Sequence, residues 1–157
     1  YALYTGDWAS HACAADQTLT ETFSVAALDG TLSSVTVTIN GSNDAAVLSS
    51  GSGAVVEDGS LTTGGTLTIV DADAGQASFA AQTATAGSFG TFTLDAAGAW
   101  TYALNNAAPA VQALGAGQTL TETFAVAALD GTTSSVTVTI NGSNDAAVLS
   151  RDRKSVV

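Results

Sequence analysis

The sequence predicts an all-β protein, a β-sandwich of about seven strands that recurs in tandem. Three observations predict this class. Apolar and polar residues alternate in short runs, turn-forming pairs such as Asp-Gly separate the runs, and one long stretch occurs twice. Alanine, threonine, glycine, serine and valine dominate the 157 residues, with a single proline, and this composition suits strands and turns.

The repeat defines the expected organisation of the chain. When the chain is slid on itself by 101 positions, residues 17–49 fall on residues 118–150 with 31 of 33 identical. We therefore expect residues 1–44 to be the C-terminal part of a preceding repeat and 45–145 to be a complete repeat. Residues 146–157 are then the start of a linker and a non-native tail, because its last six residues, DRKSVV, resemble a translated sequencing adapter. Near-identity at this spacing is typical of arrays, which serve as spacers or multivalent surfaces.

Two hairpins are predicted from period-two alternation. Residues 23–27 and 35–39 alternate apolar with polar side chains and are joined through Asp29-Gly30. An Asp-Gly pair between two such runs is a good hairpin signal. The second copy of the stretch repeats the hairpin around Asp130-Gly131.

Between the two hairpins the pattern predicts a further strand and a β-meander. Leu67 and Ile69 mark one strand. Residues 92–94 are expected to pair with residues 100–104 across the turn at 95–98, and only residues 109–116 could make a helical turn.

Charge excludes several classes of partner. Residues 1–150 contain 13 Asp and Glu but no Lys or Arg, since all three basic residues lie at 151–154. Such a body has nothing to place against a phosphate, so we expect neither nucleic-acid nor anionic-lipid binding. No run approaches the roughly 18 apolar residues of a membrane helix, so no membrane insertion is expected. Cys13 is the only cysteine and cannot form an internal disulfide.

The acidic residues gather at predicted strand ends. Asp71 and Asp73 end one strand and Asp130 lies in the last hairpin turn, which places all three at one end of a seven-strand sandwich. The linker Asn43-Asp44 arrives at this end, which we call the upper pole. Glu57 ends the first strand at the opposite end, the lower pole. The candidate metal ligands are Asn43, Asp44, Asp71, Asp73 and Asp130 at the upper pole, and Glu57, Asn144 and Asp145 at the lower pole.

These oxygen ligands predict calcium as the cofactor. Carboxylate, amide and carbonyl oxygens that converge are what Ca²⁺ prefers. Without a cation, carboxylates held close together repel one another and oppose folding. Two plainer interpretations stay open: Asp, Asn and Gly make good turns, and acidity keeps a secreted protein soluble. Each explains single motifs, but neither explains why the motifs gather at the poles.

With these motifs in view, residues 53–149 resemble a VCBS repeat of large bacterial surface proteins. The resemblance rests on GAVVEDGSLTTGGTLTIVDADAG, GSFGTFTLDAAGAWTYAL and the stretch from AVQALGAGQ to GSNDAAV. It implies a cadherin-like or immunoglobulin-like sandwich, export, and a role in adhesion or biofilm formation.

The chain is also similar to cadherin repeats, in which a linker Asn-Asp, an Asp-x-Asp and a late Asp share calcium. That resemblance implies the same five upper-pole residues as ligands. The acidic motif that cadherins place before their penultimate strand is not visible near Val111–Leu114, which implies weaker binding at the lower pole. Ala146-Ala147 stands where the family often has Ala-Pro, which implies a less stiff linker.

We therefore expect a calcium-stiffened spacer in a bacterial adhesin, extracellular or on the bacterial cell surface, with neighbouring repeats as its partners. The alternative is a module that binds a cell-surface glycan or another copy of itself. That alternative needs exposed aromatic residues such as Trp100 or Trp8, or a large apolar patch on the surface. An enzyme is not expected, because the complete repeat contains no histidine for Ser-His-Asp or Cys-His chemistry. His11, Cys13 and Asp16 lie outside the complete repeat, so no catalytic residue is assigned.

Overall fold

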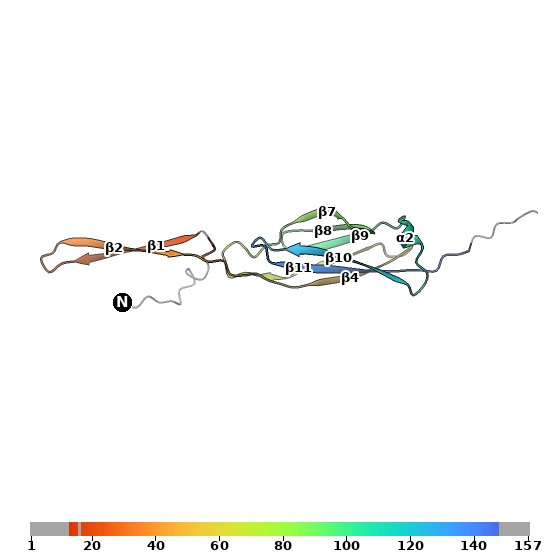
Figure 1. The fold of residues 1–157 in the computed structure, drawn as a ribbon, viewed down its shortest axis with the longest axis horizontal. Coiled ribbons are helices and arrows are strands. Elements are labelled where there is room, and N and C mark those ends of the chain that lie inside the picture. Colours follow the sequence, from red (N-terminus) through yellow and green to blue (C-terminus); the bar gives the residue numbers. More distant parts are fainter. Residues whose placement is uncertain (1–12, 16, 148–157) are drawn as a thin grey trace, which may run out of the picture.

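The computed structural model describes residues 13–15 and 17–147, and these residues are mostly β-structure (Figure 1). The predicted all-β class is confirmed. One short helix, α2 (Pro109–Gln112), lies within the segment where a helical turn was expected. No helix in these ranges is long and apolar enough to cross a membrane. The strands are β1 (Thr18–Ala26), β2 (Leu32–Asn40), β3 (Val47–Leu48), β4 (Gly51–Val56), β5 (Thr62–Thr66), β6 (Ile69–Val70), β7 (Gln82–Ala86), β8 (Gly90–Leu94), β9 (Ala99–Leu104), β10 (Thr119–Ala127) and β11 (Thr133–Asn141).

Seven of these strands form two sheets that share a core. One sheet has the order β10–β11–β4 and the other the order β5–β9–β8–β7. The three pairs of consecutive strands, β7–β8, β8–β9 and β10–β11, are antiparallel, whereas β4 runs parallel to β11. β3 and β6 form a separate, short antiparallel sheet of two strands.

Alternating side chains fill the space between the two sheets. The rings of Phe92 on β8 and Phe124 on β10 stack with centroids 4.7 Å apart. The Tyr102 ring on β9 packs against the Phe124 ring. Trp100 is only 3% exposed, and its indole packs closely against β4. A Cβ added at Gly53 in β4 would lie 2.8 Å from the ring. Glycine in β4 therefore leaves room for the indole to complete the core.

Of the three buried charged residues among those described, Glu57, Asp73 and Glu122, only Glu122 lies between the two sheets. Glu122 on β10 is 7% exposed, and its Oε2 accepts a hydrogen bond of 2.7 Å from the Tyr102 hydroxyl. Its Oε1 accepts one of 2.8 Å from the Phe89 backbone N–H. Burial and the neighbouring Glu122 carboxylate raise the pKa of Tyr102 above its ordinary value. Both oxygens of Glu122 are thus satisfied, which is what a buried carboxylate requires.

The repeated sequence folds twice into the same hairpin. β1 pairs with β2 in the register of β10 with β11, with Phe23 opposite Val35 as Phe124 lies opposite Val136. The turns also match, and Gly30 and Gly131 both adopt a positive φ, of 85° and 90°, which favours glycine. Both hairpins and their Asp-Gly turns were predicted from the sequence. Local sequence therefore determines the hairpin, even though β1–β2 pairs with no other strand among the described residues.

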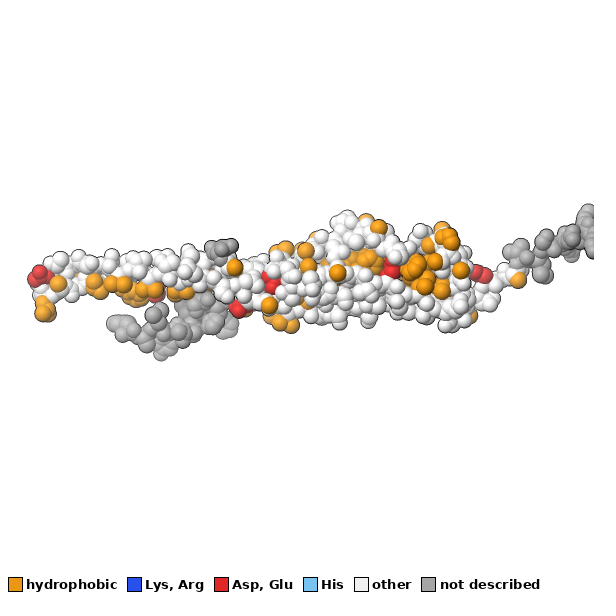
Figure 2. All heavy atoms as spheres, viewed as in Figure 1, with side chains coloured by type: hydrophobic (Ala, Val, Ile, Leu, Met, Phe, Trp, Pro, Cys, Tyr) orange, Lys and Arg blue, Asp and Glu red, His pale blue; other side chains and the backbone are white. Residues whose placement is uncertain are grey.

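The two hairpins differ in what covers them. β10–β11 is paired with β4 and packed on the other sheet, whereas β1–β2 extends away from the body (Figure 1). Phe23 is 43% exposed and Phe124 7%, and Val35 is 50% exposed while Val136 is fully buried. The uncovered apolar side chains form a stripe along the hairpin in Figure 2. The same residues are therefore core in one copy and surface in the other.

Two details depart from the predicted elements. Leu67 lies between β5 and β6 rather than within a strand, although its side chain is buried. β7 was not predicted, because Gln82–Ala86 reads QTATA and lacks large apolar residues. Pairing with β8 holds it in the sheet, with a register shift after Gln82.

Candidate metal centre

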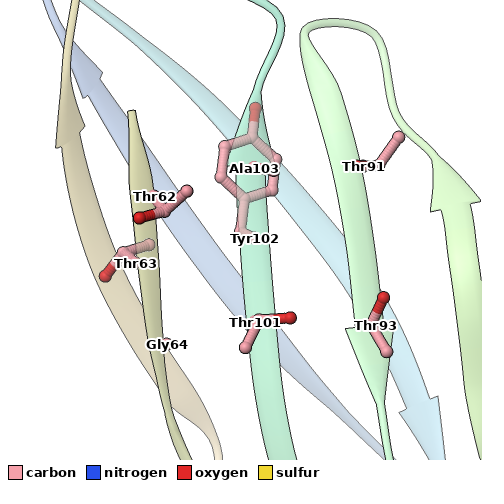
Figure 3. A pocket seen from close by; sticks show the side chains of 8 residues that line it. All are labelled: Thr62, Thr63, Gly64, Thr91, Thr93, Thr101, Tyr102 and Ala103. Atoms are coloured by element: carbon pink, nitrogen blue, oxygen red, sulfur yellow. The ribbon is translucent and has the colours of Figure 1, made fainter. Parts of the chain in front are cut away.

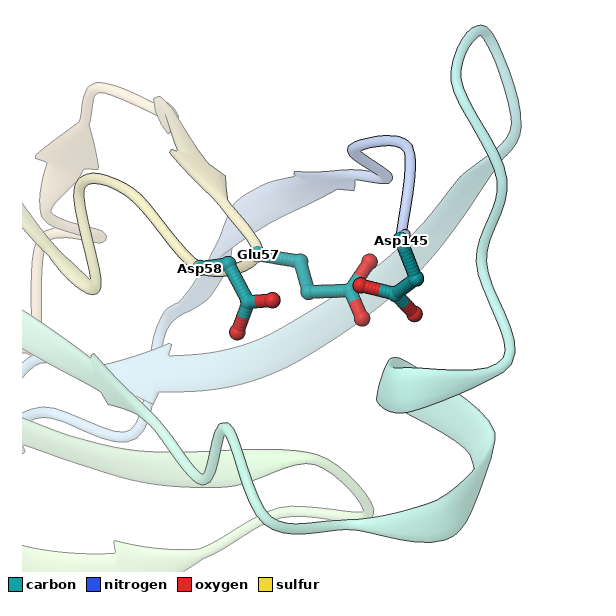
Figure 4. A group of neighbouring side chains, drawn as sticks. All are labelled: Glu57, Asp58 and Asp145. Atoms are coloured by element: carbon teal, nitrogen blue, oxygen red, sulfur yellow. The ribbon is translucent and has the colours of Figure 1, made fainter. Parts of the chain in front are cut away.

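At the lower pole, three carboxylates converge. Glu57 and Asp58 follow the end of β4, and Asp145 lies in the linker after β11. Oxygen atoms of the three side chains all lie within 4.8 Å of one another. In Figure 4 the Glu57 side chain extends towards Asp145 while Asp58 lies beside its backbone. Glu57 and Asp145 are two of the lower-pole residues named from the sequence, and Asp58 is an addition.

Glu57 is the distinctive member of this lower cluster (Glu57, Asp58 and Asp145). The residue is fully buried, and within the described part of the chain its Oε1 has no hydrogen-bond partner. Its Oε2 accepts only a long bond of 3.3 Å from the Ser143 N–H. An unsatisfied buried carboxylate oxygen is costly. Because residues 1–150 contain no Lys or Arg, this part of the chain offers it no cationic side chain.

Asp58 is exposed but firmly held. Its backbone N–H donates to Asn106 Oδ1 at 3.1 Å, and its Oδ1 accepts from Asn106 Nδ2 at 2.6 Å and from Gln112 Nε2 at 3.3 Å. Asp58 has a φ of 55°, a conformation rare for residues other than glycine. The hydrogen bonds from Asn106 and then Gln112 hold the pKa of its carboxyl below the ordinary value. The carboxylate form is therefore favoured in place.

The amide nitrogen of Asn144 bonds to the linker backbone. Its Nδ2 donates to the Asp145 carbonyl at 3.1 Å, and Asn43 makes the same bond to the Asp44 carbonyl at the other pole. The two linkers thus have the same local conformation. The amide of each Asn orients the linker backbone, while the following Asp is left exposed at its side chain.

At the upper pole, aspartates anchor the incoming linker. Asp73 Oδ2 accepts from the Asp44 N–H at 2.8 Å, and Asp130 Oδ2 accepts from the Ala46 N–H at 2.9 Å. Asp71 Oδ1 accepts from the Asp73 N–H at 2.8 Å. The Asp130 carboxylate also accepts hydrogen bonds from the N–H and the hydroxyl of Thr132, at 2.8 and 2.7 Å. These bonds, that from Ala46 first, hold the pKa of Asp130 below its ordinary value.

The anchoring bonds leave two further buried oxygens unsatisfied. Over the described ranges, Asp71 Oδ2 and Asp73 Oδ1 have no hydrogen-bond partner, and Asp73 is only 2% exposed. Of the five upper-pole residues named from the sequence, Asp73 and Asp130 bond to the linker that contains Asn43 and Asp44, and Asp71 bonds to the backbone of Asp73. Among the residues described, however, they do not bring three carboxylate oxygens within 4.8 Å of one another, as the lower cluster does. From the sequence we expected weaker metal binding at the lower pole, yet the carboxylates converge more closely there.

The chemistry of the lower cluster is compatible with a hard cation such as calcium. Three orphaned buried oxygens, at Glu57, Asp71 and Asp73, are all carboxylate oxygens. Hard oxygen ligands in an adaptable shell of six to eight are what Ca²⁺ requires, and it tolerates backbone carbonyls and water as the remainder. Zn²⁺ sites would instead be expected to draw on His and Cys.

Other features of the described chain are less suited to a function. An open hollow of about 570 Å³ lies on the outer face of the β5–β9–β8 strands (Figure 3). Its lining has no charged residue, and Tyr102, its one aromatic residue, is 1% exposed. It is lined by Thr62, Thr63, Gly64, Thr91, Thr93, Thr101, Tyr102 and Ala103.

The residues considered for other chemistry are placed only in part. Cys13 is a buried free thiol, 5% exposed, at the position that Leu114 takes in the complete repeat. It therefore acts as a small apolar residue at the hairpin base. His11, Asp16 and Trp8 lie outside the described residues. Trp100 is buried, so it offers no exposed ring for a sugar.

The comparisons with known proteins identify the family. Residues 43–142 match the family model of the bacterial cadherin-like domain. Among curated proteins, none matches the chain. The family match spans well over half of the 157 residues, so the chain belongs to the bacterial cadherin-like domain family.

Proposed function

From membership of the bacterial cadherin-like family and the geometry of the two poles, we propose that this chain is part of a calcium-stiffened spacer in a bacterial surface adhesin. In this proposal Ca²⁺ binds at the junctions between successive repeats and restricts the hinge between them. The protein acts outside the cell or on its surface, and it has a structural rather than a catalytic role.

The observation that carries the proposal is the orphaned oxygen of Glu57. A fully buried carboxylate faces two other carboxylates, and the described residues supply no donor for its Oε1. Such an arrangement would destabilise the folded state unless a cation binds there. Calcium would supply the positive charge that residues 1–150 lack.

The repeat spacing indicates that each junction combines both poles. Asp145 occupies the position of Asp44, 101 residues earlier, and the backbone of Asp44 is bound by Asp73. A repeat that followed residue 145 would therefore bring its own counterparts of Asp71, Asp73 and Asp130 to the lower cluster. The junction would then hold six carboxylates, enough for the ligand number that calcium prefers.

The uncovered β1–β2 hairpin supports the tandem arrangement. Its apolar face has the residues that β10–β11 buries against β4 and the second sheet. An isolated two-stranded hairpin is only marginally stable in water. We therefore propose that strands like β4–β9, in a preceding repeat, cover this face.

Calorimetric and thermal titration with calcium tests the proposal. Extracellular modules bind Ca²⁺ with dissociation constants of about 0.1–1 mM. At about 10 mM calcium such affinities add roughly 1.4–2.7 kcal/mol to the free energy of unfolding. The melting temperature should rise by several degrees relative to EGTA. Absence of binding heat together with an unchanged melting temperature would refute calcium binding.

Two variants make the titration specific. Glu57→Gln keeps the shape of the side chain and an acceptor for Ser143 but removes its charge, so it should abolish most of the calcium response of the lower pole. Glu21→Gln is the matched control, because it removes one negative charge from the exposed β1 strand, away from both poles. Equal responses in the two variants would show that calcium acts through net charge alone.

A further inference from the structure

Asn106 and Gln112 make contacts that the fold alone does not require. Both side chains reach across from the segment after β9 to the turn after β4, a separation of 48 and 54 residues, and both end on Asp58. α2 presents Gln112 and the loop before it presents Asn106. Gln112 lies in the region, near Val111–Leu114, where this sequence lacks the acidic motif of cadherin repeats.

The bonds to Asp58 are directed at one oxygen. Asn106 Nδ2 and Gln112 Nε2 both donate to Oδ1, and Asn106 Oδ1 accepts the Asp58 N–H. We call this arrangement of Asn106 and Gln112 around Asp58 the amide clasp. It leaves Oδ2 available for a cation, since neither amide is bonded to it. It also fixes both the backbone and the side chain of a residue with a positive φ.

The amide side chains of Asn106 and Gln112 avoid the charge repulsion that carboxylates at these positions would cause. Asp58 lies beside Glu57 and Asp145, and a further acidic side chain at position 106 or 112 would add to the repulsion when no cation is bound. Amide N–H groups instead attract the Asp58 carboxylate, with or without a cation. The cluster is thereby held in a converged geometry before binding, so less ordering has to occur when the cation arrives.

On this basis we infer that Asn106, assisted by Gln112, is a positioning residue for cation binding at the lower cluster, acting through Asp58. The inference rests on the proposed calcium function and adds to it the residues that set its affinity. Groups that orient a metal ligand without touching the metal commonly contribute 10- to 100-fold to affinity.

Calcium dissociation constants for variants of the whole chain, measured by equilibrium dialysis with ⁴⁵Ca²⁺, test the inference. Asn106→Ala should raise the dissociation constant of the lower cluster roughly tenfold or more, and Gln112→Ala by a smaller factor because its bond is longer. Asn105→Ala is the matched control, since this neighbour bonds through its backbone alone: its N–H donates to the Phe89 carbonyl and its carbonyl accepts from the Ala108 N–H. It should leave the dissociation constant unchanged.

A double-mutant cycle separates positioning from general stability. If Asn106 acts through Asp58, Asn106→Ala should have no further effect on the dissociation constant in an Asp58→Ala background. The melting temperature in EGTA should change little, and the Asp58 amide should exchange faster. A lower melting temperature in EGTA with an unchanged dissociation constant would overturn the inference and leave the calcium function intact. Failure of the unaltered chain to bind calcium would overturn both.

Discussion

Single residues in this chain take their roles from their surroundings, because the repeat provides the same residue in two settings. Phe23 and Phe124 have the same strand position and the same cross-strand neighbour. One is 43% exposed, and the other is 7% exposed between the Phe92 and Tyr102 rings. Such pairs allow each substitution to be compared with a control inside the same molecule.

The first prediction concerns these two phenylalanines. Phe124→Ala should lower the free energy of unfolding of the body by about 3–5 kcal/mol, because it removes a buried ring and leaves a cavity. Phe23→Ala should change it by less than about 0.5 kcal/mol, as is usual for surface sites. Urea denaturation followed by Trp100 fluorescence measures both. Similar losses from the two substitutions would mean that the first hairpin is also packed in solution.

The second prediction concerns acid and the Asp130 anchor. The folded-state pKa of Asp130 is lowered, so its stabilising effect is fully present above the unfolded pKa of about 3.9 and is lost as the pH falls through the folded value. Asp130→Asn should lower the melting temperature at pH 7, and the difference from the unaltered chain should shrink below about pH 4.

Asp29→Asn is the control for this effect. Asp29 also accepts the N–H two residues ahead and has a lowered pKa, but its hairpin is not anchored to a linker as Asp130 is through Ala46. It should leave the melting temperature of the body unchanged at every pH. A difference between Asp130→Asn and the unaltered chain that persists at pH 2 would contradict the titration argument.

At the residue scale, the sequence predicts which acidic positions stand at strand ends but not how their oxygens are used. Spacing placed Glu57 and Asp145 at one pole, and the structure brings them within 4.8 Å. Asp58 was overlooked as a ligand, although its place beside Glu57 was a visible signal. Its orientation depends on Asn106, 48 residues away, and no local pattern reveals such a contact. Whether these residues bind a metal stays a prediction.

Individual strands and turns were the most predictable elements. The hairpins follow from alternation and Asp-Gly, which act over neighbouring residues and hold even where no second sheet covers them. β7 could not be predicted, because its threonines and alanines have no alternation of size. It becomes a strand through pairing with β8, a tertiary effect.

The third prediction concerns the stability of the two hairpins. Backbone amides within Thr119–Ala127 and Thr133–Asn141 should exchange with solvent only when the body unfolds, because β10–β11 is held by β4 and the core. Those within Thr18–Ala26 and Leu32–Asn40 should exchange orders of magnitude faster through local opening. Hydrogen exchange resolved by NMR measures this. Equal protection at low protein concentration would contradict the uncovered hairpin.

At the scale of the whole molecule, the described residues form one two-sheet body and a separate two-stranded hairpin. Figure 2 shows acidic side chains near the start and the end of the body. The hollow over the β5–β9–β8 strands, which lies between the poles, has no charged residue in its lining. The carboxylates with unsatisfied buried oxygens therefore lie at the two ends of the body.

The fourth prediction completes the first repeat. A copy of residues 45–101 placed directly before Tyr1 would supply the strands that the β1–β2 hairpin lacks, because Tyr1-Ala2-Leu3 matches Tyr102-Ala103-Leu104. In this longer chain Phe23→Ala should cost about 3–5 kcal/mol in the first repeat, in place of almost nothing. Denaturation in urea measures it. If Phe23→Ala remains without effect, a preceding repeat does not cover the hairpin.

Cation binding at the poles is the claim on which the proposed function depends, and a crystal structure of this chain grown in millimolar calcium tests it most directly. We predict an anomalous difference peak at the lower cluster, with Glu57 Oε1 about 2.3–2.6 Å from the ion and Asp58 and Asp145 among the other ligands. A structure in which Glu57 Oε1 instead bonds to water or to a backbone N–H, with no ion between the three carboxylates, would contradict the account.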